Sequence, residues 1–513
     1  MLQYLAKAGA VASLLWMTSA SPQNSGNASV PCEALLSTNL SSRVLLPNDP
    51  LYEPRVQSYY IGNGRLHPWC FFLPQTASEL STAIKALSAA ATAAGEDRDW
   101  HIAVRSGGHM WPGSNNIING VTIDMGNMNA SSYDEQTKLA SIETGARWSD
   151  VYRILHDRYN VTVTGGRDGD VGVGGFLLGG GNSYHTGRNG FGCDTIINYQ
   201  VILANGSIVD ANQSENPDLY KALKGGGPNY GIVTRFDVET LPAVDLAFGD
   251  NIYDVEHMSE MMDAQSDFTA TTDESGGDHT FNYFQIGAND SLVFARKVNT
   301  KGNLNTSAFD AFNRIPTKKQ DWSLTSLADA APPAKEGEGL NAASYTYTAK
   351  NTRPMAQYIL SRFQRLSTTL STKYGAEKYM TLMITQPLPA YYSTISQRNG
   401  GNVLGLDKQL ANTSTGAALY VIAITPLAST DEALAVADAE IKAMLEDLDR
   451  EAEKQDAVVQ WRYMNYADAS QNPLASYGEE NLEFLEKVAG VYDPEGWWQD
   501  MVPGGFKIGK ARV

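Results

Sequence analysis

The sequence predicts an α+β fold with more than one domain. The chain has 513 residues, a length that corresponds to roughly two to four ordinary domains. Between Pro68 and Pro242, short apolar strands alternate with amphipathic helices and glycine-rich turns. The composition is 42% hydrophobic and 19% charged, with 46 glycines. These values support a large core with many turns, and they argue against a disordered or fibrous chain.

Several elements of the region 68–242 can be placed from their patterns. Strands are expected at 101–105, 121–125 and 138–143, and Asn205-Gly206 predicts a β-hairpin. One helix is expected after the capping box Thr76–Glu79. Its apolar face is formed by Leu80, Ala83, Ile84 and Leu87. A second helix is expected to have an apolar face of Trp148, Val151, Tyr152 and Leu155. A third is expected to begin at Asn216-Pro217, as an N-cap followed by proline at the first helical position.

The second region, residues 246–457, has few glycine clusters. Strand-like runs lie at 281–286 and 418–424. The strongest helix is expected to begin at the capping box Ser429–Glu432. Its apolar face is formed by Leu434, Ala437, Ile441, Leu445 and Leu448. The charged stretch 446–456 closes this helix and is typical of a solvated face or a boundary. From Val458 onward, the tail is again rich in aromatic residues, glycine and proline.

The N-terminus carries the features of a signal peptide, expected to cover residues 1–20. Lys7 precedes an apolar run, Ala8 to Met17, and Thr18-Ser19-Ala20 provides a small-residue cleavage site. No later stretch approaches the ~20 apolar residues of a membrane-spanning helix. Candidate glycosylation sites of the form N-x-S/T are Asn27, Asn39, Asn129, Asn160, Asn205, Asn212, Asn289, Asn305 and Asn412. We therefore expect a secreted protein without a membrane span.

The charge and the cysteine content narrow the classes of partner and site. The net charge is −18, which repels polyanions and makes nucleic acid an unfavourable partner. Only three cysteines occur, and an oxidising compartment favours pairing of Cys32 with Cys70. Cys193 then remains as either a buried, inert thiol or a nucleophile that would need a base such as His185.

Three glycine clusters follow strands or lie in loops of the first region. They are Arg105-Ser-Gly-Gly-His109, Val171-Gly-Val-Gly-Gly175 with its continuation to Gly181, and Gly225 to Gly231. In the second cluster, the third glycine of the dinucleotide fingerprint falls on Leu177, and the chain has no G-x-x-x-x-G-K-[ST] motif. Taken alone, the first cluster also fits a strand-ending turn with a structural histidine. Together, the clusters indicate a long ligand that is held by bare backbone.

Other common sites are not indicated. The seven histidines show no spacing that is typical of metal ligands, and H-E-x-x-H does not occur, so no metal is expected. The chain has no G-x-S-x-G nucleophile motif. Asp168-Gly-Asp170 does not have the remaining ligands of a calcium loop.

These motifs resemble those of the berberine bridge enzyme-like FAD-linked oxidases, in the vanillyl-alcohol-oxidase, or PCMH-type, flavoprotein superfamily. The resemblance rests on RSGGH at 105–109, VGVGG at 171–175, GGGPNYGIVT at 225–234 and YMNYAD at 463–468. The tail at 492–508 is similar to that of fungal members. The resemblance implies a PCMH-type FAD-binding domain over 21–245 (core 68–242), completed by 458–513. An α/β substrate-binding domain over 246–457 would be inserted between these two parts.

The resemblance also assigns site residues. His109 would bond covalently to the 8α-methyl carbon of FAD, and Tyr466 would be the catalytic base. Contacts to the cofactor are implied for Arg105, Ser106, Gly107, Gly108, Val171, Gly172, Gly174, Gly175, Gly179, Val233 and Asn465. Tyr466 alternatively fits a core aromatic residue whose hydroxyl is hydrogen bonded.

One position departs from the family pattern. Many relatives carry a cysteine three residues before V-G-V-G-G that forms a second bond to the flavin, and this chain has Asp168 there. The flavin is therefore expected to have a single covalent link, through His109. Asp168 fits either a hydrogen-bonded loop carboxylate or an acid–base group. Val171 stands where relatives carry an oxygen-access residue, and valine there accompanies oxidase behaviour.

The implied reaction is a two-electron oxidation of a small molecule. Ionised Tyr466 would remove a proton from a substrate hydroxyl while a hydride passes to the flavin, and O₂ would then reoxidise the flavin and give H₂O₂. Because a free tyrosine has a pKa of about 10, such a base needs a neighbouring charge or hydrogen bond. The fungal-type tail and the single link favour an enzyme of secondary metabolism. The alternatives are a carbohydrate oxidase and a flavin-binding cyclase without net redox turnover.

Overall fold

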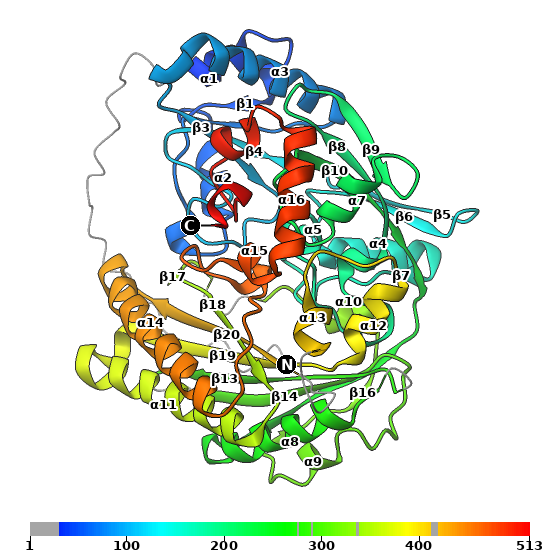
Figure 1. The fold of residues 1–513 in the computed structure, drawn as a ribbon, viewed down its shortest axis with the longest axis vertical. Helices are drawn as coiled ribbons and strands as arrows, with labels where there is room; N and C mark the ends of the chain where they lie inside the picture. Colours follow the sequence, from blue (N-terminus) through cyan, green and yellow to red (C-terminus); the bar gives the residue numbers. More distant parts are fainter. Residues whose placement is uncertain (1–29, 274–275, 289–290, 335–337, 412–418, 513) are drawn as a thin grey trace.

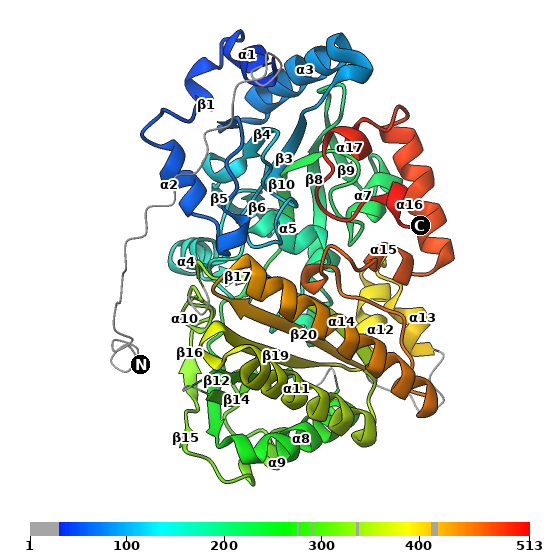
Figure 2. The ribbon, with the colours of Figure 1, turned by 90° about the vertical axis from the view of Figure 1, so that its left-hand side faces the viewer.

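The computed structural model describes residues 30–273, 276–288, 291–334, 338–411 and 419–512. The chain forms two regions that lie one above the other in Figure 1 and Figure 2. We call residues 30–242 together with 458–512 the upper region, and residues 246–457 the lower region. The proposed signal peptide and Asn27, Asn289 and Asn412 fall outside the described residues.

A four-stranded sheet forms one part of the upper region. Its order is β1 (Val44–Leu45), β2 (Cys70–Phe72), β4 (Gly120–Asp124) and β3 (His101–Arg105), and β2, β4 and β3 are parallel. Two helices, α1 (Val30–Leu36) and α3 (Ala77–Ala94), pack at this sheet, and α2 (Tyr52–Gln57) follows β1. Helix α3 begins as the sequence predicts, because the Thr76 hydroxyl accepts from the Glu79 N–H at 3.1 Å. Its predicted apolar face is fully buried.

An antiparallel five-stranded sheet forms the second part of the upper region. Its order is β5 (Ser131–Asp134), β6 (Leu139–Glu143), β10 (Ile232–Glu239), β8 (Ile196–Ile202) and β9 (Ile208–Asn212). Strands β8 and β9 form the hairpin predicted at Asn205-Gly206, and Gly206 has a φ of 77°. Helices of this part are α4 (Trp148–Tyr159), α5 (Val173–Leu178), α6 (Thr186–Asn189) and α7 (Pro217–Leu223), and β7 (Val161–Thr162) pairs with β11 (Leu241–Pro242).

Helix α7 begins at Pro217 with Asn216 at the N-cap position, as predicted, but the capping side chain bonds elsewhere. The side chain of Asn216 makes no capping hydrogen bond to the helix. Instead, Asn216 adopts a left-handed conformation, with a φ of 49°, and its Nδ2 donates to the carbonyl of Asp210 at 2.7 Å. The proline therefore fixes the start of the helix, while the asparagine ties it to the preceding strand.

A sheet of nine described strands forms the lower region. Its path is β15 (Lys319–Gln320), β12 (Leu246–Tyr253), β14 (Ser291–Asn299), β13 (Asp278–Ile286), β19 (Tyr379–Leu388), β20 (Leu419–Ala428) and β17 (Asn341–Ala342), and β16 (Ser323–Thr325) and β18 (Tyr345–Lys350) pair with β12 and β20. Helices α8 (Met258–Thr271), α11 (Arg353–Tyr374) and α14 (Asp431–Lys454) cover one face (Figure 2). The other face turns toward the upper region. Shorter helices are α9 (Asp310–Asn313), α10 (Leu327–Ala330), α12 (Tyr391–Arg398) and α13 (Leu406–Ala411).

The start of α14 corrects the predicted capping box by one residue. Thr430, not Ser429, is the N-cap, and its hydroxyl accepts from the Ala433 N–H at 3.2 Å. Ser429 lies between the end of β20 and this N-cap, and its N–H donates to the Lys378 carbonyl. The predicted charged stretch is largely helical, since α14 continues to Lys454.

After α14 the chain returns to the upper region. Helices α15 (Pro473–Ser476), α16 (Glu479–Tyr492) and α17 (Trp497–Met501) lie against elements from the first half of the chain, in red beside green and blue in Figure 1. Helix α16 packs on α7, and Trp498 of α17 is buried in the core beneath α3. The tail is thus part of the same core as the glycine clusters.

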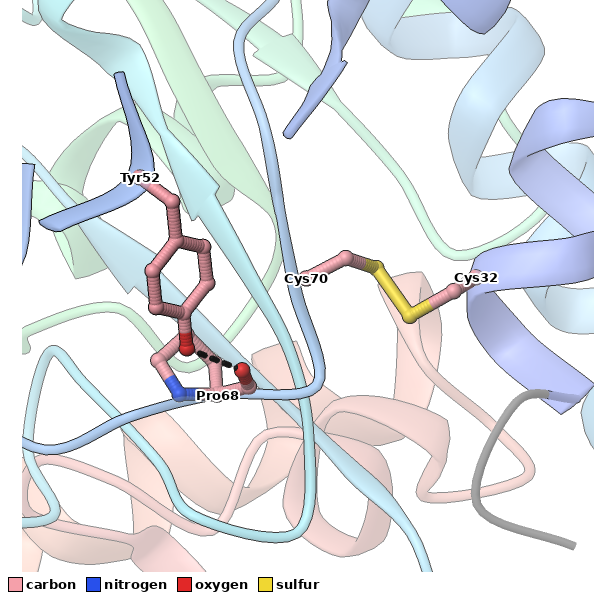
Figure 3. The surroundings of a disulfide bond; sticks show 4 residues. All are labelled: Cys32, Tyr52, Pro68 and Cys70. Atoms are coloured by element: carbon pink, nitrogen blue, oxygen red, sulfur yellow. Dashed lines mark hydrogen bonds between the residues drawn. A yellow bond between two sulfur atoms is a disulfide. The ribbon is translucent and has the colours of Figure 1, made fainter. Parts of the chain in front are cut away.

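A disulfide joins Cys32 of α1 to Cys70 of β2 (Figure 3), as the sequence predicts. Beside it, the Tyr52 hydroxyl donates to the Pro68 carbonyl. Cys193 is a free and buried thiol, and its burial raises its pKa well above the ordinary value. A thiol in this state is a poor nucleophile, which favours the inert of the two predicted roles.

Two observations relate to the predicted secretion of the protein: the exposure of the candidate glycosylation sites and the character of the helices. Of the candidate glycosylation sites that the structure describes, Asn39, Asn129, Asn160, Asn205 and Asn305 are exposed and Asn212 is half-buried. Among the described residues, none of the helices has the length and apolar character needed to cross a membrane.

Candidate active site

The loop 105–109 follows β3 directly, and the side chain of Arg105 holds it in place through contacts within the protein. The Arg105 side chain is buried and forms an ion pair with Asp124 at 3.1 Å. It also donates to the backbone carbonyls of Arg55 and Ser58, and its guanidinium lies 3.8 Å from the centre of the Tyr59 ring. Most of its donors are therefore used within the protein. Arg105 shapes the loop, and the backbone of the loop is what remains for a ligand.

The first two glycine clusters touch each other through their backbones. A Cβ atom on Gly107 would lie 2.4 Å from the Gly172 nitrogen, and one on Gly172 would lie 2.2 Å from the Gly107 nitrogen. Ser106 joins them further, because its hydroxyl donates to the Thr144 carbonyl and accepts from the Gly174 N–H. No residue with a side chain fits at Gly107 or Gly172, so this contact explains both glycines.

Arg147 is a residue of the site that the sequence did not indicate. Its guanidinium donates to the carbonyls of Gly107 and Asp170, and it forms an ion pair with the Asp170 carboxylate at 3.6 Å. It therefore bridges the two glycine loops. No motif marks this arginine, because it stands at the N-cap of α4 and reaches the loops only in the folded chain.

His109 lies at the end of the first loop. Its imidazole stacks on the ring of Tyr60, with centroids 4.3 Å apart and planes 16° from parallel. The Nε2 atom is buried and has no hydrogen-bond partner among the described residues. Burial, and then the positive charges of Arg147 and Arg105, lower the pKa of His109 to about 3. The imidazole is therefore neutral at physiological pH and has a free lone pair.

Tyr466 meets two donors from other parts of the chain. Its hydroxyl oxygen accepts from Arg167 Nη2 at 2.7 Å and from Gln386 Nε2 at 2.9 Å. Arg167 lies in the loop before the second glycine cluster, and Gln386 is on β19 of the lower sheet. Arg167 therefore supplies the neighbouring charge that the sequence could not identify.

The charge of Arg167 is not neutralised by a carboxylate. Its Nη1 contacts Nε2 of His279 at 3.2 Å, and it forms no ion pair within the described residues. Burial, and then the charges of Arg167 and His185, lower the pKa of His279 well below its ordinary value, so His279 is a neutral acceptor. By contrast, Arg296 on the same face of the lower sheet is paired with Asp250 at 2.6 Å. Arg167 thus contacts a neutral imidazole through Nη1 and the Tyr466 hydroxyl through Nη2.

The other tyrosine of the Y-x-N-Y motif has a different environment. Tyr463 is buried, and its hydroxyl oxygen accepts from the Asn182 N–H at 2.6 Å. Burial, and then the neighbouring Tyr466, raise the pKa of Tyr463 well above its ordinary value. Its ring packs edge-on against that of Tyr466, with centroids 4.7 Å apart. Tyr463 is therefore a neutral structural residue, whereas the hydroxyl of Tyr466 accepts from the side chains of Arg167 and Gln386.

Asn465 links the tail to the second glycine cluster. Its Nδ2 donates to the Phe176 carbonyl at 3.0 Å, while its Oδ1 is buried and without a partner among the described residues. A Cβ atom on Gly179 would lie 1.8 Å from that oxygen. Val233 lies on β10, and its carbonyl accepts from the Thr144 hydroxyl. The structure thus brings the loops 105–109 and 171–179 and residue 465 together, with Val233 next to them through Thr144.

Asp168 is held within its loop. Its Oδ1 accepts from the N–H groups of Asp170 at 2.9 Å and Ala334 at 3.0 Å. These bonds tie the loop before the second glycine cluster to the segment after α10. Of the two predicted roles, this arrangement favours the hydrogen-bonded loop carboxylate.

The residues present fit an FAD molecule. His109 Nε2 and Asn465 Oδ1 are buried polar atoms without a partner among the described residues, and both lie beside the glycine loops, where a bound ligand would satisfy them. At Gly175 a Cβ atom would meet nothing within 4 Å. Neutral His109, the bare backbone loops and Asn465 therefore form a set of groups that matches a flavin nucleotide.

Comparisons with known proteins agree with this fit. The FAD binding domain family matches residues 68–212. A fungal relative, the FAD-dependent monooxygenase sdcF of Emericella nidulans, is 33% identical over 94% of this chain and 98% of its own. The FAD-dependent monooxygenase drtC of Aspergillus calidoustus is 30% identical over 94% of this chain and 91% of its own.

Two solved structures have the same fold. The BBE-like 1 protein of Physcomitrella patens superposes with a TM-score of 0.71 at 18% identity, over 91% of this chain and 97% of that one. A chitooligosaccharide oxidase superposes with a TM-score of 0.69 at 16% identity, over 93% and 99%. The fold and the site therefore define an FAD-linked oxidoreductase with a PCMH-type FAD-binding fold. The chain belongs to the family of its fungal relatives, the FAD-dependent monooxygenases, and its fold is that of the berberine bridge enzyme-like protein.

Proposed function

We propose that this protein is a secreted oxidase that carries FAD on His109 and oxidises an alcohol or related group of a small molecule. The observation that carries the proposal is the position of the Tyr466 oxygen between Arg167 Nη2 and Gln386 Nε2. When bound, FAD supplies the two-electron acceptor and passes the electrons to O₂, which gives H₂O₂.

The two glycine loops and Asn465 would hold the cofactor. Because the Arg105 guanidinium is engaged with Asp124 and two carbonyls, we assign the contacts of the first loop to the backbone of residues 105–108 and to Ser106. Residues 171–179 and Asn465 would contact the flavin side, and Val233 would contact the cofactor from β10. His109, neutral and with a buried lone pair, would supply the nucleophile for a bond to the 8α-methyl carbon.

A single covalent link follows from the loop before the second glycine cluster. A carboxylate cannot form the thioether that a cysteine forms, and Asp168 already accepts two backbone hydrogen bonds. We therefore propose one bond, at His109. In this arrangement Asp168 keeps the loop in shape and has no part in the chemistry.

Tyr466 would act as the general base. Arg167 and Gln386 both donate to its oxygen, which fixes the direction in which that oxygen points. The base takes the proton of a substrate hydroxyl, and the carbon that bears it gives up a hydride. Since Arg167 has no carboxylate partner in the described chain, the phenolate would be its counter-ion, and the pair would be neutral.

The names of the relatives favour monooxygenation as a second candidate, because the fungal relatives are FAD-dependent monooxygenases. One experiment separates the two. Purified protein would be reduced anaerobically with a panel of alcohols and then mixed with ¹⁸O₂. Stoichiometric H₂O₂ and unlabelled product support the oxidase, whereas ¹⁸O in the product supports a monooxygenase. A flavin that no substrate bleaches would favour a cyclase without redox turnover.

The substrate class and the location of the protein belong to the same proposal. The chitooligosaccharide oxidase shares the fold, so oligosaccharides belong in the substrate panel beside non-sugar alcohols. The similarity to fungal relatives supports a role in secondary metabolism. Secretion and glycosylation are supported by the N-terminal pattern and by the exposure of Asn39, Asn129, Asn160, Asn205 and Asn305. Treating the secreted protein with an endoglycosidase and measuring its mass would test both.

A further inference from the structure

The imidazole of His109 is oriented by a ring and not by a hydrogen bond. Proteins usually fix the plane of a reactive histidine by a hydrogen bond to one of its nitrogens. No such bond to His109 is present within the described residues, and its Nε2 is buried without a partner. The specific contact that the ring makes is the parallel stack on Tyr60, at 4.3 Å and 16°.

Tyr60 is itself held firmly on both sides. Its N–H donates to the Gly108 carbonyl at 3.3 Å, next to His109, and its carbonyl accepts from the Gly339 N–H at 2.8 Å. Its side chain packs against a small cluster that contains Ala342 of β17 and Leu427 of β20. The ring of Tyr60 is therefore wedged between the lower sheet and the imidazole, so that it supports His109 from the lower region.

We propose that Tyr60 is a positioning residue for covalent flavin attachment, and that its ring holds the imidazole of His109 in the plane needed for attack. This inference rests on the proposed function, because it requires a bond between His109 and FAD. The residue does not touch the reacting atoms of the substrate. It acts through His109, and its effect is on how fast the bond forms.

The attachment step balances with O₂ as the oxidant that the proposed function already names. A C–N bond forms between an imidazole nitrogen and the 8α-methyl carbon of FAD. One C–H bond of the methyl group and the N–H bond of the imidazole break. The two protons and two electrons that are released pass, through the flavin ring, to O₂ and give one H₂O₂.

The test measures the rate of attachment. Full-length protein is produced in a riboflavin-limited host, mixed with FAD in air, precipitated with acid at intervals and scored for bound flavin. Loss of the ring in Tyr60→Met should slow attachment about tenfold, the scale of one stacked aromatic pair, while total FAD bound before acid stays unchanged. Tyr60→Phe, which keeps the ring, should react at the wild-type rate. The matched control is Tyr133→Leu, which removes a half-buried tyrosine that contacts Tyr159 on α4.

Each outcome decides the matter. Wild-type attachment rates in Tyr60→Met, or an equal slowing in Tyr60→Phe, would overturn the role of the ring. If Tyr60→Met does not fold, Tyr60→Leu takes its place, and Tyr60→Phe still separates the ring from the hydroxyl. A wild-type protein that never retains flavin after acid would instead refute the covalent link of the proposed function, which is a different result.

Discussion

His109 and Tyr466 lie in the same site but are held by opposite means. The His109 ring has no hydrogen bond in the described structure and rests on an aromatic face, beside loops that offer mainly backbone. Tyr466 is held by a cation and an amide, from two distant parts of the chain. Burial and the positive charges of Arg147 and Arg105 keep His109 neutral, whereas the Tyr466 hydroxyl is fixed by polar donors. These two environments suit the roles proposed for them, a neutral nucleophile at His109 and a base at Tyr466.

The largest effect should come from His109. In His109→Ala, the nucleophile is absent and the neutral lone pair is lost, so no covalent flavin can form. Protein precipitated with acid should be colourless, while the wild-type precipitate stays yellow. Yellow precipitate from the variant would show that another residue forms the link. His109 would then not be the attachment site, and its comparison with Tyr466 would no longer hold.

Removal of the base comes next. Tyr466→Phe keeps the ring and deletes the oxygen that Arg167 and Gln386 hold, so turnover should fall about a hundredfold or more. The flavin should remain attached after acid precipitation, because His109 is untouched. Anaerobic flavin reduction in a stopped-flow instrument measures the loss. A rate near that of the wild type would remove Tyr466 from the mechanism.

A smaller effect is expected at Arg167. In Arg167→Met the Tyr466 oxygen loses the charged donor at 2.7 Å, so flavin reduction should slow about tenfold, the scale of one hydrogen bond to a charged group. Stopped-flow reduction of the flavin under anaerobic conditions measures the change.

Arg167→Lys is the matched control for this change. It keeps the charge and a donor, and it should restore part of the rate. A rate in Arg167→Lys as low as that of Arg167→Met would mean that the arginine supports the site only through its shape.

The smallest effect on chemistry should come from the disulfide. Cys70 lies on β2, in the sheet whose strand β3 leads into the loop of His109. Because the bond closes a loop with a sequence separation of 38, Cys32→Ser with Cys70→Ser should lower the free energy of unfolding by about 4 kcal/mol. Urea denaturation measures this change. The rates of flavin attachment and of flavin reduction should stay unchanged in the folded variant. A lower reduction rate would show that the sheet containing Cys70 is mechanically coupled to the site.

The surroundings of His109 could be predicted from the sequence far better than the surroundings of Tyr466. Glycines 107 and 172 are visible as a motif because backbone contact excludes every side chain there. The start of α3 and the hairpin at Gly206 depend on local chemistry in the same way. Asn216 and Ser429 show the limit. The Asn216 side chain bonds the Asp210 carbonyl instead of capping its helix, and Thr430 takes the N-cap role that was expected of Ser429.

Arg167, Gln386, His279 and Arg147 were not predicted as site residues. Gln386 is 80 residues from Tyr466 in sequence, and Arg167 is 299 residues from it, and neither stands in a recognisable pattern. Their roles depend on how the lower sheet meets the upper region, which is decided by packing and not by local propensity. Tyr60 was not predicted for the same reason, although it precedes His109 by fewer than fifty residues.

The return of the tail to the first half of the chain governs when the enzyme can be completed. Asn465 reaches the Phe176 carbonyl across 289 residues, and Tyr466 follows it directly. A ribosome has therefore synthesised nine-tenths of the protein before it adds Asn465 and Tyr466, the last residues proposed to face the flavin. Capture of the cofactor would then wait for translation to end, and any chain cut short before this point would leave its glycine loops without Asn465.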